Sequence, residues 1–254
     1  MASAGEPWES SMMLIDRLLR ILKRGTFRDS WKQAEYRRLA EAVAPWVYPG
    51  RLVDVGCGEG LFTSHVASAG TSAAVIGLDV AGHEDWGRHS RSVRFVVGDA
   101  SRPPMTSGCA DVVLAKDLLH HADDPVAAAT WLVRLAKKRV IVIEANAENP
   151  IMAFYTRHNG DEHFTDARLA ALLEQACPRA TWTRSAAVSY PFYLPPVRTM
   201  SAVWVWPATL LMIVAFKILR NRAAAAWLHH ILARRRWTPP FMIRVLDLES
   251  ESRT

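Results

Sequence analysis

Short apolar segments alternate with helical or polar stretches between Arg51 and Glu144. Each segment is apolar on consecutive residues, as expected for a strand that is buried on both faces of a parallel sheet. Parallel strands need long crossover connections, and the stretches between the segments provide them. The pattern therefore predicts five buried strands, at residues 52–55, 74–79, 93–97, 111–115 and 140–143.

Helical periodicity and two later apolar segments complete the pattern. Residues 11–24 read as a basic amphipathic helix, residues 31–43 as a second helix, and residues 165–176 as a third with Thr165 and Asp166 as cap candidates. Two further strands are predicted around residues 180–189 and 241–248. The fold class is therefore α/β, a doubly wound, mostly parallel sheet of seven strands.

About fifty residues separate the last two predicted strands, and they are rich in Trp, Leu, Ala and Arg. We predict that they form an α-helical apolar insertion. A chain of 254 residues allows one large domain with an appendage. The predicted organisation is N-terminal helices at 1–44, a ligand-binding core at 45–190, a basic apolar insertion at 191–240, and a final strand and tail at 241–254.

The net charge of +6 is concentrated in this insertion. Residues 1–197 hold 22 basic and 22 acidic side chains, whereas residues 198–246 hold eight basic and no acidic ones. Because the predicted core is neutral and the basic segment is aliphatic, nucleic acid is an unlikely partner. No signal peptide is recognisable, so we expect a cytoplasmic protein.

Three interpretations of the insertion stay open. Its uncharged stretch, residues 199–216, is marginal for crossing a membrane, because 18 residues of helix span about 27 Å. The following segment, residues 218–237, ends in three arginines and a tryptophan, which suits a helix lying on an anionic membrane surface. Alternatively, both segments pack on each other as a lid. A sixth strand parallel to the others would deliver the insertion to the edge of the sheet where ligands bind.

The strongest motif for chemistry is Val53-Asp-Val-Gly-Cys-Gly-Glu-Gly60, a strand that runs into a glycine-rich turn and then a helix. Glycines allow a ligand to approach the main chain closely, and a helix N-terminus offers unpaired N–H groups. Asp79 ends the next predicted strand, where an acidic side chain typically binds ribose hydroxyls. Asp99 follows the third strand at the same edge of the sheet.

These residues resemble the class I S-adenosylmethionine-dependent methyltransferases, of the small-molecule type that includes quinone-pathway enzymes. The resemblance rests on VDVGCGEG, GLD, GDA and ADVVLAKDLLHHADDP, in this order. It implies a Rossmann-like fold, with Asp54 and the glycine loop around the methionine part of S-adenosylmethionine. It also implies that Asp79 holds the ribose and that Lys116 and Asp117 lie beside the methionine carboxylate and the sulfonium. The cofactor-binding residues implied are Asp54, Gly56, Gly58, Gly60, Asp79, Asp99, Ala100 and Lys116. A fold that binds a nicotinamide cofactor is the alternative.

Methyl transfer from a sulfonium is an in-line displacement in which the protein mainly aligns the reactants. When the acceptor is a hydroxyl or an acidic carbon, a neutral histidine would help to remove its proton. The catalytic candidates are His120, at the end of the fourth-strand motif, and His158 and His163, in the polar stretch after the fifth strand. His121 shares the first motif. Packing or solvent exposure is the alternative role for each of them.

The cysteines Cys57, Cys109 and Cys177 do not form a metal-binding pattern, so no metal is predicted. The sequence thus predicts a methyltransferase that acts on an oxygen or carbon of a lipophilic small molecule, such as an isoprenoid, quinone, polyketide or lipid. Docking on the cytoplasmic face of an anionic membrane is part of this hypothesis. The alternative is a methyltransferase-like module that binds the cofactor or a partner without catalysis and uses the insertion as an interaction surface.

Overall fold

The computed structural model describes residues 26–70, 72, 74–89, 91–149, 152–153, 162–178, 180–187 and 239–248. The chain divides into two units, and all described strands lie in the unit that comprises residues 36–190 and 226–254. The predicted helix at 11–24, both predicted segments of the insertion and His158 lie outside the described residues. The proposed division into domains therefore stays a prediction.

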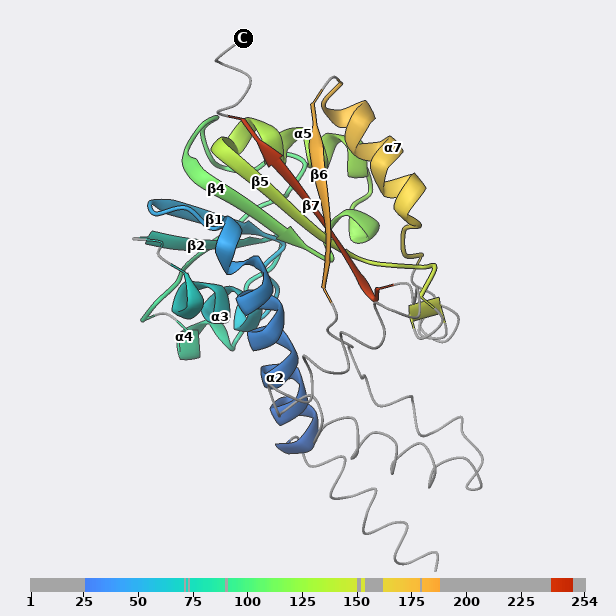
Figure 1. Ribbon diagram of the computed structural model, residues 1–254. Coiled ribbons are helices and arrows are strands. Elements are labelled where there is room, and N and C mark those ends of the chain that lie inside the picture. The colour runs from blue at the N-terminus through green and yellow to red at the C-terminus, as the bar shows by residue number, and fades with distance from the viewer. Residues whose placement is uncertain are drawn as a thin grey trace, which may run out of the picture. The chain divides into compact units, whose positions relative to one another are not determined.

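Seven strands form one sheet in the order β3-β2-β1-β4-β5-β7-β6 (Figure 1). Strands β1 to β5 pair in parallel, and β7 pairs antiparallel with both β5 and β6. This topology confirms the predicted doubly wound, mostly parallel sheet. The strands are β1 (Arg51–Val55), β2 (Ala74–Asp79), β3 (Arg94–Val97), β4 (Ala110–Lys116), β5 (Ala136–Ala145), β6 (Trp182–Ala187) and β7 (Phe241–Asp247).

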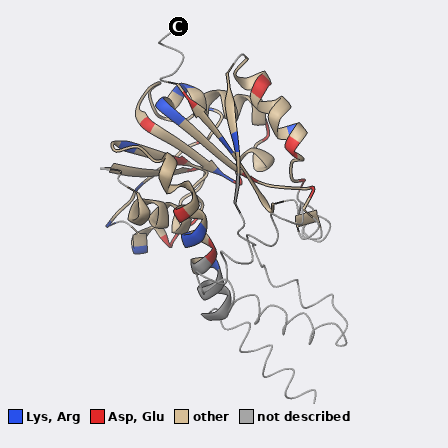
Figure 2. Cartoon of the chain, in the orientation of Figure 1, with Lys and Arg blue, Asp and Glu red and all other residues tan. Residues whose placement is uncertain are grey.

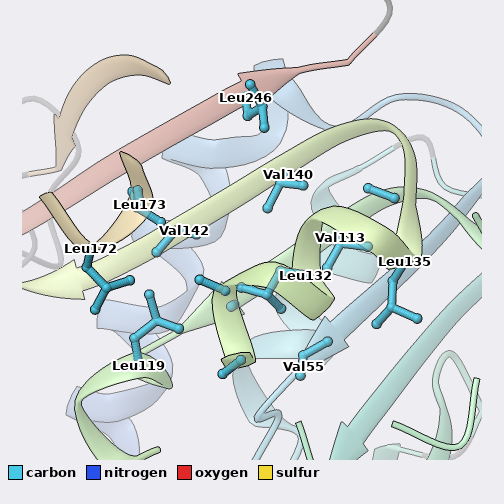
Figure 3. Close-up of a cluster of buried hydrophobic side chains, with 14 of the residues drawn as sticks. Val55, Val113, Leu119, Leu132, Leu135, Val140, Val142, Leu172, Leu173 and Leu246 are labelled. Atoms are coloured by element: carbon cyan, nitrogen blue, oxygen red, sulfur yellow. The ribbon is translucent and has the colours of Figure 1, made fainter. Parts of the chain in front are cut away.

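Two apolar clusters cover the two faces of the sheet, because alternate residues of each strand point to opposite sides. Val53 of β1 belongs to the cluster that includes side chains of α5 (Pro125–Leu135) and α7 (Asp166–Ala176), part of which Figure 3 shows. Leu52 belongs to the other cluster, which includes side chains of α2 (Thr26–Val43) and α3 (Leu61–Ala69). The core is therefore a sheet between two helical layers.

The strand β5 begins four residues before the predicted segment and includes the charged residues Lys137, Lys138 and Arg139. Arg139 is tolerated in the sheet because its guanidinium donates four hydrogen bonds. It donates two hydrogen bonds to the carboxylate of Asp247, one to the carbonyl of Trp46 and one to the hydroxyl of Tyr48. The strand is extended toward its N-terminus by this charged network, which hydrophobic patterning does not reveal.

The connection between β6 and β7 starts and ends at the carboxyl edge of the parallel strands. Ala187, the last residue of β6, pairs with Phe241, the first residue of β7, and Phe241 pairs with Ala145 at the end of β5. The strand β6 therefore runs parallel to β5, as the sequence predicted. Basic and acidic residues are interspersed over the described elements (Figure 2). Among the described residues, no helix has the length and apolarity that a membrane crossing requires.

Candidate active site

A glycine loop follows β1 at the carboxyl edge of the sheet, where the strand order reverses between β1 and β4. The amides of Gly56 and Cys57 both donate to the carbonyl of Leu78 in β2, at 2.8 and 3.0 Å. Gly60 ends the loop as the N-cap of α3, and no side chain caps this end of the helix. The loop is thus fastened to the neighbouring strand, and an uncapped helix N-terminus faces the same edge.

Two glycines of the loop have different surroundings. Gly58 has φ +53°, and a Cβ placed on it would meet nothing within 4 Å. Gly60 has φ +83°, and a Cβ placed there would lie 2.5 Å from Cζ of Phe95. Left-handed backbone favours glycine at both positions. The open space beside Gly58 is the kind of cradle that a ligand approaching the main chain needs, whereas Gly60 is required for packing.

The two carboxylates predicted to bind the nucleoside part of a cofactor lie at the same edge. Asp79 ends β2 and accepts a hydrogen bond of 2.7 Å from the amide of Gly58 through Oδ2. Asp99 follows β3, is exposed, and accepts from the amide of Ser101. The amide of Gly98 donates to the carbonyl of Asp79, which joins the ends of the two strands. Each carboxylate oxygen has two lone pairs, so both side chains keep capacity for a ligand.

Asp54 is buried at the end of β1, beside the loop. Its Oδ2 accepts a hydrogen bond of 2.6 Å from the hydroxyl of Thr63, and its Oδ1 is buried with no hydrogen-bond partner among the described residues. Burial raises the pKa of Asp54 to about 7, although Thr63 and the charge of Lys116 oppose the shift. Asp54 therefore carries an unsatisfied acceptor and titrates near neutral pH.

Asp54→Asn is expected to stabilise the protein at high pH. The folded state binds one more proton than the unfolded state between about pH 4 and pH 7, because burial raises the pKa of Asp54 in the folded state only. The contribution of Asp54 to the free energy of unfolding therefore falls as pH rises. At pH 8 the variant should gain about 2–4 kcal/mol in urea denaturation, and at pH 4 almost nothing. Asp123→Asn, at an exposed position, is the control, and an equal gain at both pH values would contradict the prediction.

The residues that follow β4 form an ion pair within the site. Nζ of Lys116 pairs with Oδ2 of Asp117 and lies 4.8 to 5.9 Å from the ring centroids of Tyr36, Phe62 and Phe241. Asp117 has φ +48°, a strained conformation for a residue other than glycine. Burial would raise its pKa, but the charge and hydrogen bond of Lys116, with the charges that His120 and His163 carry when protonated, outweigh burial and lower it. Asp117 is therefore held as a carboxylate at the end of β4.

Glu144 and His120 form a buried pair beside this strand end. Glu144 is the penultimate residue of β5, and His120 lies in the short helix η2 (Leu119–His121) that follows β4. Oε1 of Glu144 accepts the amides of Leu118 and Leu119, and Oε2 lies 2.6 Å from Nδ1 of His120. The exposed fractions of the two side chains are 0% and 2%. Burial raises the pKa of Glu144, opposed by the hydrogen bonds from His120 and Leu119.

This pairing fixes the imidazole. A carboxylate only accepts hydrogen bonds, so Nδ1 of His120 donates to Glu144 and its lone pair is on Nε2. Gly56 of the glycine loop lies directly beside Leu118, since a Cβ on Gly56 would lie 2.8 Å from Cδ1 of that residue. The arrangement therefore places an imidazole of fixed orientation next to the glycine loop.

The other predicted histidines have different positions. His163 lies just before the N-terminus of α7, and its ring centroid is 4.7 Å from that of His120, in an edge-on contact. His121 is exposed and contacts the ring of His120. The structure thus brings two of the three catalytic candidates, His120 and His163, together, and His158 lies outside the described residues.

Asp117, His120 and Glu144 also offer three ligand atoms within 4.8 Å of one another. Both oxygens of Glu144 already accept hydrogen bonds, and the ammonium of Lys116 pairs with Asp117. This donor set is therefore better suited to orienting an imidazole than to binding a cation. Cys57 is not a suitable nucleophile, because burial and two nearby carboxylates raise the pKa of its thiol.

The only sequence signal for Glu144 is its position just after the fifth predicted strand, and sequence reasoning missed Thr63 and Trp86. Trp86 begins the short helix α4 (Trp86–His89), and its indole Nε1 donates to the carbonyl of Gly58 at 2.8 Å. No periodic pattern marks this tryptophan, because it contacts the loop through a connection with little regular structure. Thr63 could have been suspected, since it lies on the first turn of the helix that follows the loop.

Comparisons with known proteins show which family this part of the chain is similar to. A family described as "Methyltransferase domain" matches residues 53–143. An uncharacterized chloroplastic methyltransferase of Arabidopsis thaliana is 30% identical in an alignment of 132 residues, and the match covers 44% of this chain. The match spans only 38% of that relative's length.

Solved structures are similar at low identity and support the fold alone. One is a complex of the Haloferax volcanii methyltransferase activator Trm112 with a methyltransferase, with a TM-score of 0.56 and 17% identity, over 85% of this chain and 90% of the other. Another is the Burkholderia thailandensis 1,6-didemethyltoxoflavin N1-methyltransferase with S-adenosylhomocysteine bound, with a TM-score of 0.53 and 17% identity, over 97% and 92% of the two chains.

Proposed function

We propose that the protein transfers a methyl group from S-adenosylmethionine to a small molecule, because residues 53–143 match the family described as a methyltransferase domain. The observation that carries the proposal is the joint geometry of two features at one edge of the sheet. The glycine loop has open space beside Gly58, and the His120–Glu144 pair lies next to the same loop. A cofactor cradle and an oriented base are what such a reaction needs.

The described residues fit S-adenosylmethionine. The open space at Gly58 and the uncapped N-terminus of α3 suit the methionine end, with its carboxylate near helix N–H groups. The unsatisfied Oδ1 of Asp54 suits a hydrogen-bond donor such as the ammonium group. Asp79 would hold the ribose, and Asp99 with Ala100 would meet the adenine. When bound, the cofactor supplies an activated methyl group on a sulfonium.

Lys116 has a less direct role in this proposal than the resemblance implied. Its ammonium is engaged by Asp117 and three aromatic rings, and it also opposes the raised pKa of Asp54. We infer that the positive charge of Lys116 stabilises the ionised forms of Asp54 and Asp117, and that Lys116 does not contact the cofactor directly. Asp117 then presents a carboxylate to the space at the end of β4, where the reacting groups would meet.

His120 would act as the general base. With Nδ1 held by Glu144, Nε2 is the nitrogen that can accept a proton from the acceptor. A base of this kind contributes when the acceptor is a hydroxyl or an acidic carbon, which loses a proton on methylation. His163 contacts the ring of His120 and would limit its movement. Oxygen or carbon methylation is therefore the reaction type that we propose.

A lipophilic acceptor is supported by where the predicted insertion joins the sheet. Its two flanking strands end and begin at the carboxyl edge, at Ala187 and Phe241. The chain therefore leaves and re-enters the sheet at the edge where ligands bind in folds of this kind, and the sequence between these two points is largely apolar. We propose acceptors such as isoprenoids, quinones, polyketides or lipids, with the protein docked on the cytoplasmic face of an anionic membrane.

Calorimetric titration with S-adenosylmethionine and S-adenosylhomocysteine tests the proposed function. Binding of both at micromolar dissociation constants is the expected result, and it would justify a screen of lipophilic acceptors with labelled methyl groups. Absence of binding by folded protein, with the fold checked by circular dichroism, would contradict the cofactor assignment. Binding without any methyl transfer would favour a module that binds without catalysis.

Membrane docking has its own test. The full chain should sediment with vesicles that contain about 30% anionic lipid and remain in the supernatant with neutral vesicles, because basic residues near a membrane each contribute about 1 kcal/mol. Replacing Arg234, Arg235 and Arg236 with Gln should reduce sedimentation at least tenfold. Arg88→Gln, in the core unit, is the control. Equal sedimentation with neutral and anionic vesicles would overturn this part of the proposal.

A further inference from the structure

Trp86 fastens the part of the glycine loop that has the least steric support. Gly58 is open to space on the side where a Cβ would lie, and glycine has more conformational freedom than any other residue. Both peptide groups of Gly58 are nevertheless held. Its amide donates to Oδ2 of Asp79 at 2.7 Å, and its carbonyl accepts from the indole Nε1 of Trp86 at 2.8 Å.

The hydrogen bond from the indole fixes the orientation of the whole peptide between Gly58 and Glu59. In a planar trans peptide the C=O and N–H groups point in opposite directions, so an anchored Gly58 carbonyl also sets the direction of the Glu59 amide. Without the indole, a rotation of this peptide would reverse both groups in a loop predicted to hold the cofactor. The hydrogen bond that the Gly58 amide donates to Asp79 restrains only the preceding peptide.

Trp86 is itself held in position by packing. Its ring stacks on Phe95 of β3, with centroids 4.7 Å apart and planes 9° from parallel. Phe95 in turn fits against the backbone of Gly60 and Gly77, where a Cβ would lie 2.5 and 2.8 Å from its ring atoms. A continuous path of contacts therefore runs from two glycines through Phe95 and Trp86 back to the loop.

We propose that Trp86 is a positioning residue for the cofactor site, which holds the Gly58–Glu59 peptide in its binding orientation through the indole N–H. This inference rests on the proposed function. It predicts that cofactor affinity depends on a single N–H group that lies outside the glycine motif. The stack on Phe95 holds the indole ring in place, and the indole N–H orients the Gly58–Glu59 peptide.

Trp86→Phe tests the proposal, because phenylalanine retains an aromatic ring over Phe95 but lacks the N–H donor. The dissociation constant of S-adenosylhomocysteine, measured by calorimetry, should rise about three- to tenfold, as expected for one lost hydrogen bond. The melting temperature should change little. Trp131→Phe, on α5 beside Arg134, is the matched control and should leave the affinity unchanged.

A spectroscopic measurement distinguishes positioning from general stability. The indole N–H resonance that Trp86→Phe removes should exchange slowly with solvent in the unliganded wild type and should shift on addition of S-adenosylhomocysteine. The resonance removed by Trp131→Phe should not shift. The Trp86 resonance can also be assigned in the wild-type protein from its nuclear Overhauser contacts with Phe95, so the measurement remains decisive if the variant folds poorly.

The outcomes separate this inference from the function on which it rests. Wild-type protein that binds S-adenosylhomocysteine, together with a Trp86→Phe variant of equal affinity, would overturn the role of Trp86 alone. A Trp86 resonance that exchanges rapidly and does not respond to the ligand would do the same. Folded wild-type protein that does not bind S-adenosylhomocysteine would contradict the proposed function and this inference together.

Discussion

Replacing Gly58 with leucine is expected to weaken the binding of S-adenosylhomocysteine by more than about 100-fold while the protein stays folded. Gly58 has φ +53° and open space where a Cβ would lie. A leucine side chain would project into this space, which we assign to the cofactor. The left-handed backbone adds strain of about 1–2 kcal/mol, which a domain of this size tolerates. Calorimetry measures the loss of affinity, and circular dichroism checks the fold.

Two other glycines provide controls for this variant. Gly87→Ala, in α4, also adds a Cβ that meets nothing within 4 Å, and this glycine has no left-handed backbone, so binding and stability should persist. Gly60→Ala should instead destabilise the fold, because its Cβ would collide with Phe95. If Gly58→Leu binds the ligand as tightly as wild type, the cofactor does not lie against the loop, and the site assignment fails.

The central strands could be predicted because they are mostly buried on both faces, so runs of consecutive apolar residues mark β1, β2, β4, β5 and β7. The edge strands β3 and β6 are partly exposed, but all seven predicted strands are present. Prediction was poorest where a strand continues through charged residues. The strand β5 begins at Ala136 because Arg139 is neutralised by Asp247, a partner 108 residues away. The helix α5 was not singled out, although its local signal, Asp124 as N-cap before Pro125, is present in the sequence.

Some residues of the candidate site could likewise be predicted from the sequence, and others could not. The cofactor residues could be proposed from the sequence because they are local to a motif or end consecutive strands of one sheet edge. The pairing of His120 with Glu144 could not be predicted from the sequence, because these residues lie on different elements. Only the register of β4 with β5 brings them together. Trp86 is a further example, since it contacts the loop 28 residues away in sequence through one hydrogen bond.

Glu144→Gln is expected to lower the rate of methyl transfer by about 10²–10⁴-fold with little change in cofactor affinity. Glutamine keeps an oxygen that can accept the amides of Leu118 and Leu119, so the turn after β4 should persist. Its amide nitrogen would face Nδ1 of His120 and donate to it. Nδ1 would then have to be the acceptor, and the ring proton would move to Nε2. An Nε2 that carries a proton cannot accept one from the acceptor, and an imidazole held in the wrong tautomer loses rates of this order.

The tautomer can be measured without knowing the acceptor. Long-range ¹H–¹⁵N spectra should show Nδ1 of His120 protonated in the wild type and Nε2 protonated in Glu144→Gln, with calorimetry confirming unchanged binding of S-adenosylhomocysteine. Glu148→Gln, exposed just beyond the same strand, should leave the tautomer and the rate unchanged. Glu144→Leu differs from both, because it leaves two amides and an imidazole buried without their acceptor and should cost several kcal/mol of stability. A Glu144→Gln variant that shifts the tautomer but transfers methyl groups at the wild-type rate would show that His120 is not the base, and the chemistry would then rest on alignment of the reactants alone.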